Sequence, residues 1–233
     1  MNIAARIVSP LAHLFFPYVC AACGSDIIIE PNLLCLQCIQ DLPHTFYARL
    51  PDNPVEKIFW GRIELSAAMS ECYFSKGTIV QSLIHQLKYK GNKKVGFMLG
   101  NIMGKSLLDS NRFTDVDAIV PLPLNPKRAR ERGYNQSEIL CNGISKILGI
   151  PVLNGIVIRT RSTETQTKKR RGQRWENVEG SFDVINKEYL TGKHLLLVDD
   201  VITTGATLEA CGSVILQIPA TRLSIATLAW ATK

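Results

Sequence analysis

The alternation of apolar and polar positions predicts a regular series of helices and strands from about residue 63 to the C-terminus. Apolar residues at helical spacing predict four helices, at 79–87, 95–102, 139–147 and 208–218. Short apolar runs predict four strands, at 117–121, 155–158, 194–198 and 223–228. Because strands and helices alternate, we expect an α/β fold in which a parallel sheet is flanked by helices.

The first sixty residues follow a different pattern, which predicts a separate small unit. Four of the seven cysteines lie between Cys20 and Cys38, and a stretch with Pro and Asn but no periodicity follows them. We therefore predict three parts, namely a zinc-ribbon-like cysteine module at 1–45, a linker at 46–62 and the α/β domain at 63–233. The chain has 233 residues, of which 46% are hydrophobic, so it can bury a core and is not a wholly disordered protein.

The cysteine spacing predicts a metal site built from Cys20, Cys23, Cys35 and Cys38. Each Cys-x-x-Cys pair lets two thiolates reach one ion from a tight turn, and two pairs complete a tetrahedral sulfur shell that suits Zn²⁺. Such a shell has no open position, so we expect structural zinc. An iron–sulfur cluster, two disulfides and buried thiols without a ligand role are the alternatives. The remaining cysteines are expected to be small core residues: Cys72, Cys141 and Cys211.

The apolar N-terminal segment does not have the pattern of a secretory signal or a membrane span. Arg6 and His13 interrupt the apolar run, and Pro10 and Pro17 would break a helix. No stretch of the chain reaches the roughly 18 uninterrupted apolar residues that a spanning helix needs. We therefore expect a cytoplasmic protein without a membrane span, in which the cysteines are reduced.

The strand predicted at 194–198 is followed by two adjacent carboxylates, Asp199 and Asp200, and then by a turn rich in Thr and Gly. In open α/β sheets, ligands bind at this end of a parallel strand. Backbone N–H groups, Thr hydroxyls and a helix N-terminus suit a phosphate, and Gly205 permits a close approach of the backbone. The carboxylates suit sugar hydroxyls or a divalent cation. The pattern indicates a sugar-phosphate site; the alternative is an ordinary helix cap beside two solvated aspartates.

The positive charge of the chain is concentrated in one segment. The formal charge is +7, and residues 127–174 contain twelve Lys and Arg against three acidic residues. Arginines in loops can clamp pyrophosphate or follow a nucleic-acid backbone, and the alternative is a solvated basic loop. Tyr134 and Trp175 are the aromatic residues of this segment that could stack on bases. The candidate contacts to pyrophosphate or a DNA backbone are Arg128, Arg132, Arg161 and Arg174.

The stretch from Leu195 to Thr207 resembles the phosphoribosyl-pyrophosphate (PRPP) loop of type I phosphoribosyltransferases. The resemblance implies that Asp199 and Asp200 hold the 2′- and 3′-hydroxyls of ribose as catalytic acids. It also implies that Mg²⁺ lies on the pyrophosphate and ribose oxygens. The loop implied to bind the 5′-phosphate consists of Val201, Thr203, Thr204, Gly205, Ala206 and Thr207.

Four motifs in order along the chain are similar to those of the ComF family, the competence proteins of DNA uptake. They are the cysteine pairs, LKYKG at 87–91, the VPLPL motif with RGYNQ at 120–136, and an Arg/Thr/Gln/Asn motif at 161–178. In the last motif, the residues after Gln166 are Thr-Lys-Lys-Arg-Arg, where the family pattern has a more apolar position. The resemblance implies a factor that handles single-stranded DNA in natural transformation, with a helicase-like ATPase among its partners.

Two other functions stay open beside the DNA-handling role. An active phosphoribosyltransferase, a kind of glycosyltransferase, would displace pyrophosphate from PRPP with an amine or a nucleobase nitrogen. A non-catalytic sensor would bind PRPP or a nucleotide without turnover. The PRPP loop is compatible with all three functions, so the sequence predicts the ligand class more sharply than the activity.

Overall fold

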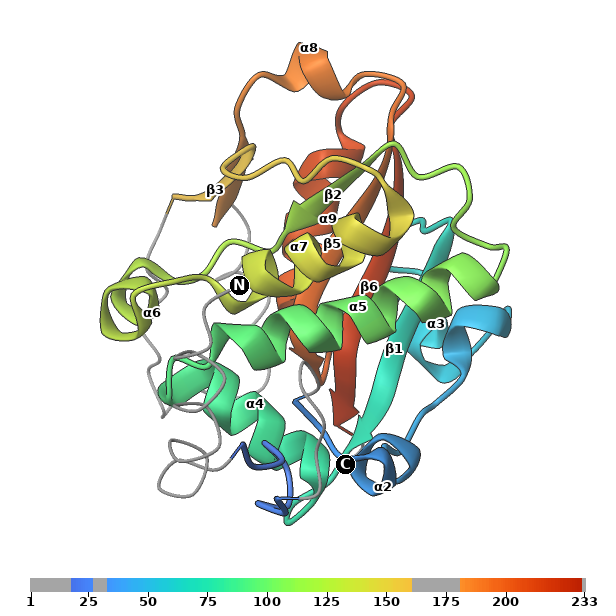
Figure 1. The fold of residues 1–233 in the computed structure, drawn as a ribbon. Coiled ribbons are helices and arrows are strands. Elements are labelled where there is room, and N and C mark those ends of the chain that lie inside the picture. The colour runs from blue at the N-terminus through green and yellow to red at the C-terminus, as the bar shows by residue number, and fades with distance from the viewer. Residues whose placement is uncertain (1–17, 27–32, 161–180, 232–233) are drawn as a thin grey trace, which may run out of the picture.

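The computed structural model describes residues 18–26, 33–160 and 181–231. In these ranges the chain is built around a four-stranded parallel sheet with the strand order β1-β6-β5-β2 (Figure 1). The strands are β1 (Ala67–Phe74), β2 (Ala118–Pro121), β5 (His194–Ile202) and β6 (Arg222–Ala231). The predicted α/β class with a parallel sheet is therefore confirmed. Three residues that the sequence singles out lie outside the described residues, namely Arg161, Arg174 and Trp175.

Helices cover both faces of this sheet. α5 (Lys93–Asp109) and α7 (Gln136–Leu148) lie side by side across one face, and α9 (Ala206–Leu216) lies on the other (Figure 1). With α4 (Ile79–Tyr89), these are the four helices that the apolar spacing predicts. Two shorter helices, α6 (Pro126–Arg132) and α8 (Lys187–Leu190), lie at the periphery. None of the helices within the described ranges is both long and apolar enough to cross a membrane.

Three strands differ from the sequence prediction, and one of them, β4 (Phe182–Val184), lies where no strand is predicted. β3 (Val157–Arg159) forms where a strand is predicted, but it pairs antiparallel with β4 (Phe182–Val184), outside the main sheet. β1 was not predicted, because the polar residues Ser70 and Glu71 interrupt its apolar pattern. Both are buried, and a Glu71 carboxylate oxygen lies 2.7 Å from Nδ1 of His44 and accepts a hydrogen bond from Ser106 at 3.1 Å. These partners satisfy part of the polarity that hid the strand.

The segment predicted as a linker is packed against the sheet. It contains η1 (Tyr47–Arg49) and α3 (Pro54–Lys57), and both Val55 and Phe59 are buried in the same core as β1. Asn53 caps α3 by accepting from the N–H of Val55 at 2.9 Å, and its amide donates to the carbonyl of Ala68 in β1 at 2.8 Å. Residues 46–62 therefore contribute buried side chains to the core, although Phe46 and Trp60 are exposed. The predicted division into domains stays a prediction.

The crossing of α5 and α7 depends on two glycines that let the helix backbones touch. A Cβ on Gly100 would lie 2.3 Å from the carbonyl oxygen of Leu140, and a Cβ on Gly143 would lie 2.3 Å from that of Phe97. Both obstacles are backbone atoms, which no side-chain rotation can move. The helix that carries Ser137 into the candidate site is therefore positioned by this contact.

Replacing Gly100 or Gly143 by Ala is expected to destabilise the protein by about 1–3 kcal/mol, because the added methyl group overpacks the crossing. In an ordinary helix, the same change would stabilise by up to about 1 kcal/mol. Urea denaturation measures the difference. Asn142→Ala, at an exposed neighbouring position on α7, is the matched control and should leave stability nearly unchanged. A glycine variant as stable as the wild type would contradict the close contact.

Candidate functional site

A cleft of about 800 Å³ opens at the carboxyl end of β5, where the sequence predicts a ligand site. Five residues of the predicted acid pair and loop line it: Asp199, Asp200, Val201, Thr203 and Thr207. The others of the predicted loop (Thr204, Gly205 and Ala206) lie in the same turn but outside the cleft lining. β5 does not end before the two aspartates as predicted, because its pairing with β6 continues through them to Ile202. The strand itself therefore carries both carboxylates into the cleft.

The basic wall of the cleft comes from α6. Asn125 caps this helix by accepting from the N–H of Lys127 at 2.9 Å, and Gly133 ends it with a positive φ of 74°. None of the residues of α6 is buried, and the helix projects from the sheet (Figure 1). Arg128 and Arg132, two of the four predicted arginines, line the cleft from this helix together with Lys127. The acidic turn and the basic segment are thus brought together.

The turn between β5 and α9 is held from behind by the segment before β1. Gly205 has a φ of 74°, and a Cβ on it would lie 2.8 Å from Ile58 and 3.1 Å from the ring of Phe59. Arg62 donates to the carbonyl of Thr204 at 2.9 Å and forms an ion pair with Glu209 of α9. Gly205 is therefore required because Ile58 and Phe59 pack against it. The local sequence motif does not show this contact.

Sequence reasoning assigned no role to Lys88 or Ser137, yet both contact the aspartate pair. The Lys88 ammonium from α4 lies 2.8 Å from Asp200, in an ion pair that is mostly buried. Ser137 donates to Asp199 at 3.2 Å, and the same oxygen of Asp199 accepts from the backbone N–H of Asp200 at 2.8 Å. The signal that could have indicated Lys88 is its place in LKYKG, one of the family motifs.

The aspartate pair carries less negative charge than two free carboxylates would. Burial and the neighbouring charge of Asp200 raise the pKa of Asp199 from 3.8 to about 7, against the opposing effects of the Asp200 N–H, Lys88 and Ser137. Near neutral pH, Asp199 therefore exchanges between its acid and its ionised form. The protonated form of Asp199 can donate a hydrogen bond and the ionised form can only accept, so the pair can do both near neutral pH.

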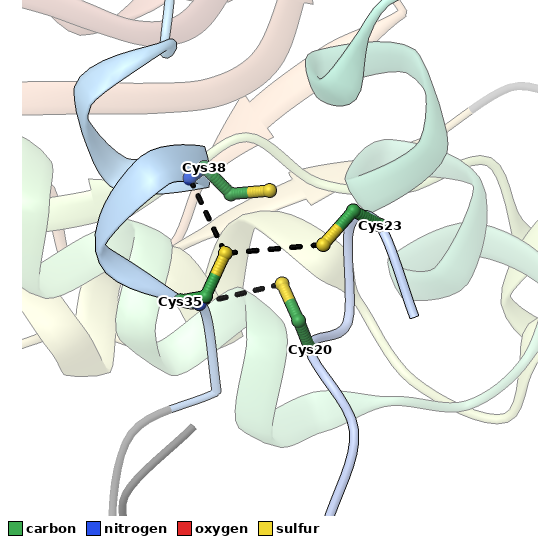
Figure 2. Close-up of side chains that lie close together, drawn as sticks. All are labelled: Cys20, Cys23, Cys35 and Cys38. Carbon is green, nitrogen blue, oxygen red and sulfur yellow. Dashed lines mark hydrogen bonds between the residues drawn. The ribbon is translucent and has the colours of Figure 1, made fainter. Parts of the chain in front are cut away.

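The four N-terminal cysteines converge on one point (Figure 2). Their sulfur atoms all lie within 4.8 Å of one another, and those of Cys23 and Cys35 are 3.8 Å apart. Tetrahedral coordination at a metal–sulfur distance of about 2.3 Å separates the sulfurs by about 3.8 Å. The N–H of Cys35 donates to the Cys20 sulfur at 3.3 Å, and that of Cys38 to the Cys35 sulfur at 3.5 Å. The cluster could hold a metal ion such as zinc.

The other cysteines and the predicted stacking residue are part of the packed structure. Cys72, Cys141 and Cys211 are buried in the core, as predicted. Tyr134, expected as a ring that could stack on bases, is instead partly buried and packed on the core. Its hydroxyl donates to the carbonyl of Leu87, and the Lys93 ammonium lies 4.9 Å from its ring centroid. The ring therefore joins the start of α7 to the end of α4, and its role in stacking on bases stays a prediction.

Comparison with known proteins relates the chain to two groups. The family model for the phosphoribosyl transferase domain matches residues 135–232, which include the aspartate pair and the turn. Competence protein F of Haemophilus influenzae is 29% identical over 84% of this chain and 89% of its own length. DNA utilization protein YhgH of Escherichia coli is 33% identical over 58% of this chain and 60% of its own length. Competence protein ComFC of Bacillus subtilis is 32% identical over 42% of this chain and 38% of its own length.

The raised pKa of Asp199 predicts that the site costs stability at neutral and alkaline pH. The folded-state pKa lies above the ordinary value of 3.8, so the folded state is favoured while Asp199 keeps its proton, and this advantage is lost as the pH rises through about 7. Asp199→Asn keeps an oxygen for Ser137 and removes the charge. We expect it to stabilise the protein by about 0.5–2 kcal/mol near pH 8, with a gain that shrinks toward pH 4.

Thermal and urea unfolding over this pH range measure the effect. The matched control is Asp109→Asn on α5, where the carboxylate is exposed and lies 3.8 Å from Arg49 in a surface ion pair. Its effect should be small at every pH. An Asp199→Asn variant that is less stable than the wild type near pH 8 would show that the ionised carboxylate is not strained in the fold.

Proposed function

We propose that this chain, a member of the ComF family with a phosphoribosyltransferase domain, binds a PRPP-like sugar phosphate and assists the handling of single-stranded DNA in natural transformation. One observation carries the proposal: the acids of β5 and the arginines of α6 line a single cleft of about 800 Å³. This volume lies in the range of small-molecule sites. The names of the relatives, competence protein and DNA utilization protein, support the DNA role.

Each part of the cleft has a proposed role toward the sugar phosphate. Asp199 and Asp200 accept hydrogen bonds from the 2′- and 3′-hydroxyls. When the diol binds, Lys88 either leaves the Asp200 carboxylate or contacts it together with the diol. The turn from Val201 to Thr207 takes the 5′-phosphate at the N-terminus of α9, where backbone N–H groups suit an anion. Mg²⁺ would accompany PRPP on its pyrophosphate and ribose oxygens, the hard oxygen ligands that this ion prefers.

The arginines are proposed to meet either the pyrophosphate or the backbone of a DNA strand. Arg128 and Arg132 are supported by their place in the cleft wall, and Arg161 and Arg174 complete the proposed set from outside the described residues. A helicase-like ATPase is the proposed protein partner. None of the seven cysteines forms a disulfide in the structure, and cysteines that stay reduced suit the reducing compartment of a cytoplasmic protein.

Isothermal calorimetry with PRPP and Mg²⁺ tests the sugar-phosphate site. We expect wild-type protein to bind, and the double variant Asp199→Asn/Asp200→Asn to bind at least about tenfold more weakly, because it loses the charged acceptors for the diol. Asp109→Asn, at an exposed carboxylate on α5, serves as the control and should bind like the wild type. If wild-type protein gave no heat of binding with PRPP, the proposed site would be abandoned.

Turnover in the same cleft is the second candidate function. It is favoured by the presence of both acids, the turn and a basic wall in one cavity, which together could stabilise a departing pyrophosphate. Pyrophosphate release from PRPP in the presence of amines and nucleobases would assign a phosphoribosyltransferase. Binding of PRPP without release for any acceptor would instead assign the non-catalytic role.

For the four-cysteine cluster we propose structural zinc. The sulfur-only shell, its two Cys-x-x-Cys turns and the N–H donors to the sulfurs suit Zn²⁺ without an open coordination position. The cluster also contacts the main domain, since Gln86 of α4 donates to the carbonyl of Ala21 between the first two cysteines. The proposed metal would therefore stabilise a surface that rests on the helix carrying Lys88.

Metal analysis of purified protein is expected to find about one zinc per chain and no iron. Cys23→Ser should lower the zinc content and the melting temperature, because it removes one of the four ligands. Since Cys23 is exposed, the change itself has little effect on packing. The matched variant Cys141→Ala alters a buried core cysteine and should retain zinc. Iron with acid-labile sulfide in the wild type would replace the zinc assignment by a cluster, and a protein without metal would overturn both.

A further inference from the structure

A second pocket of about 400 Å³ adjoins the proposed PRPP cleft. It is lined by the end of α4 and by α6, through Lys88, Tyr89, Gly91, Arg128, Glu131 and Arg132. Four of these residues also line the larger cleft: Lys88, Arg128, Glu131 and Arg132. The two spaces therefore share a wall, and a ligand in the second pocket would lie next to one in the first.

The feature specific to the second pocket is the exposed ring of Tyr89. Its relative exposure is 67%, although the other large apolar residues of the same helix pack on the core. The Arg132 guanidinium lies 5.5 Å from the ring centroid, and the ring of His85 lies 4.9 Å away, one turn earlier on α4. A hydrogen bond from Arg132 to Gln136 at 2.6 Å fixes the guanidinium. The ring is thus held between neighbours and still accessible.

The charges around this ring select the class of ligand. Three cations, Lys88, Arg128 and Arg132, face one acid, Glu131, and the Lys88 charge is partly used by Asp200. An apolar ligand would gain little from such a polar pocket. A ligand that is both aromatic and anionic can stack on the ring and pair with the arginines, which is the chemistry of a nucleotide.

We propose that Tyr89 is a base-stacking residue for single-stranded DNA, and that the strand reaches the PRPP cleft across the end of α4 with its phosphates on Arg128 and Arg132. The inference rests on the proposed function for the identity of the ligand as single-stranded DNA. The stacking of a base on the Tyr89 ring is argued from the pocket alone. A duplex would hold its bases inside the stack, so an exposed single ring suits a strand whose bases are free. Tyr89 thus offers an exposed ring to a base, whereas the ring of Tyr134 is partly buried.

Fluorescence anisotropy with two labelled strands of equal length and charge tests the stacking. One strand is oligothymidylate and the other is an abasic deoxyribose-phosphate strand, so that both offer the same phosphates and only one offers bases. Tyr89→Leu is expected to weaken binding of oligothymidylate by about 5- to 150-fold, the range for the loss of one stacked base. Binding of the abasic strand should stay unchanged, and Tyr89→Phe, which keeps the ring, should retain affinity for both strands.

The chain offers a matched control at Tyr189 on α8. This ring is 54% exposed and has the Lys193 ammonium 5.0 Å from its centroid, but it lines neither pocket. α8 lies at the opposite end of the molecule from α4 (Figure 1). Tyr189→Leu should therefore leave both affinities unchanged, and thermal unfolding of each variant verifies that it is folded.

Three results would overturn the stacking role. They are equal binding of oligothymidylate by the wild type and Tyr89→Leu, an equal loss for both strands, and no binding of single-stranded DNA by the wild type. PRPP calorimetry on Tyr89→Leu keeps this question apart from the proposed function, because Tyr89 lies outside the lining of the larger cleft. Normal PRPP binding with a lost preference for bases supports the stacking role, whereas absent PRPP binding in the wild type counts only against the sugar-phosphate site.

Discussion

The parallel pairing of β5 with β6 is the interaction on which the candidate site depends. The pairing continues past the apolar run, with Asp199 opposite Thr227 and Val201 opposite Ala229. Both carboxylates therefore lie at the carboxyl end of a paired strand. The burial that results raises the pKa of Asp199 to about 7, and the Lys88 ion pair at 2.8 Å compensates Asp200. β5 thus holds two carboxylates close together at its carboxyl end, where a bound ligand could offset their mutual repulsion.

Segments from distant parts of the chain support this arrangement from different sides. The region around Phe59 and Arg62 packs behind the turn and leaves no space for a side chain on Gly205. α7, fixed by its glycine contact with α5, presents Ser137 to Asp199. α4 carries Lys88 at the site and Gln86 against the cysteine module. A change in any of these supports would therefore act on the cleft through packing, without contact with a ligand.

The parts that could be predicted are those with a local signature. Helical spacing located α4, α5, α7 and α9, and the paired cysteines indicated a cluster whose sulfurs do converge. β1 was not predicted because Ser70 and Glu71 interrupt its apolar pattern, and the partners of the buried Glu71 carboxylate, His44 and Ser106, lie elsewhere in the chain. The contact of Lys88 with Asp200 spans 112 positions, so no local pattern contains it. The packing of Tyr134 on α4 is likewise a tertiary contact that no local pattern contains.

A competition measurement tests most directly whether one cleft accepts both the sugar phosphate and the DNA strand. Labelled single-stranded DNA is bound to the wild-type protein and titrated with PRPP and Mg²⁺, while sodium sulfate at matched ionic strength controls for charge screening. If Arg128 and Arg132 serve both ligands, PRPP displaces the strand and the anisotropy falls to that of free DNA, with no comparable fall in sulfate. An anisotropy that stays constant while calorimetry under the same conditions detects bound PRPP would contradict a shared cleft.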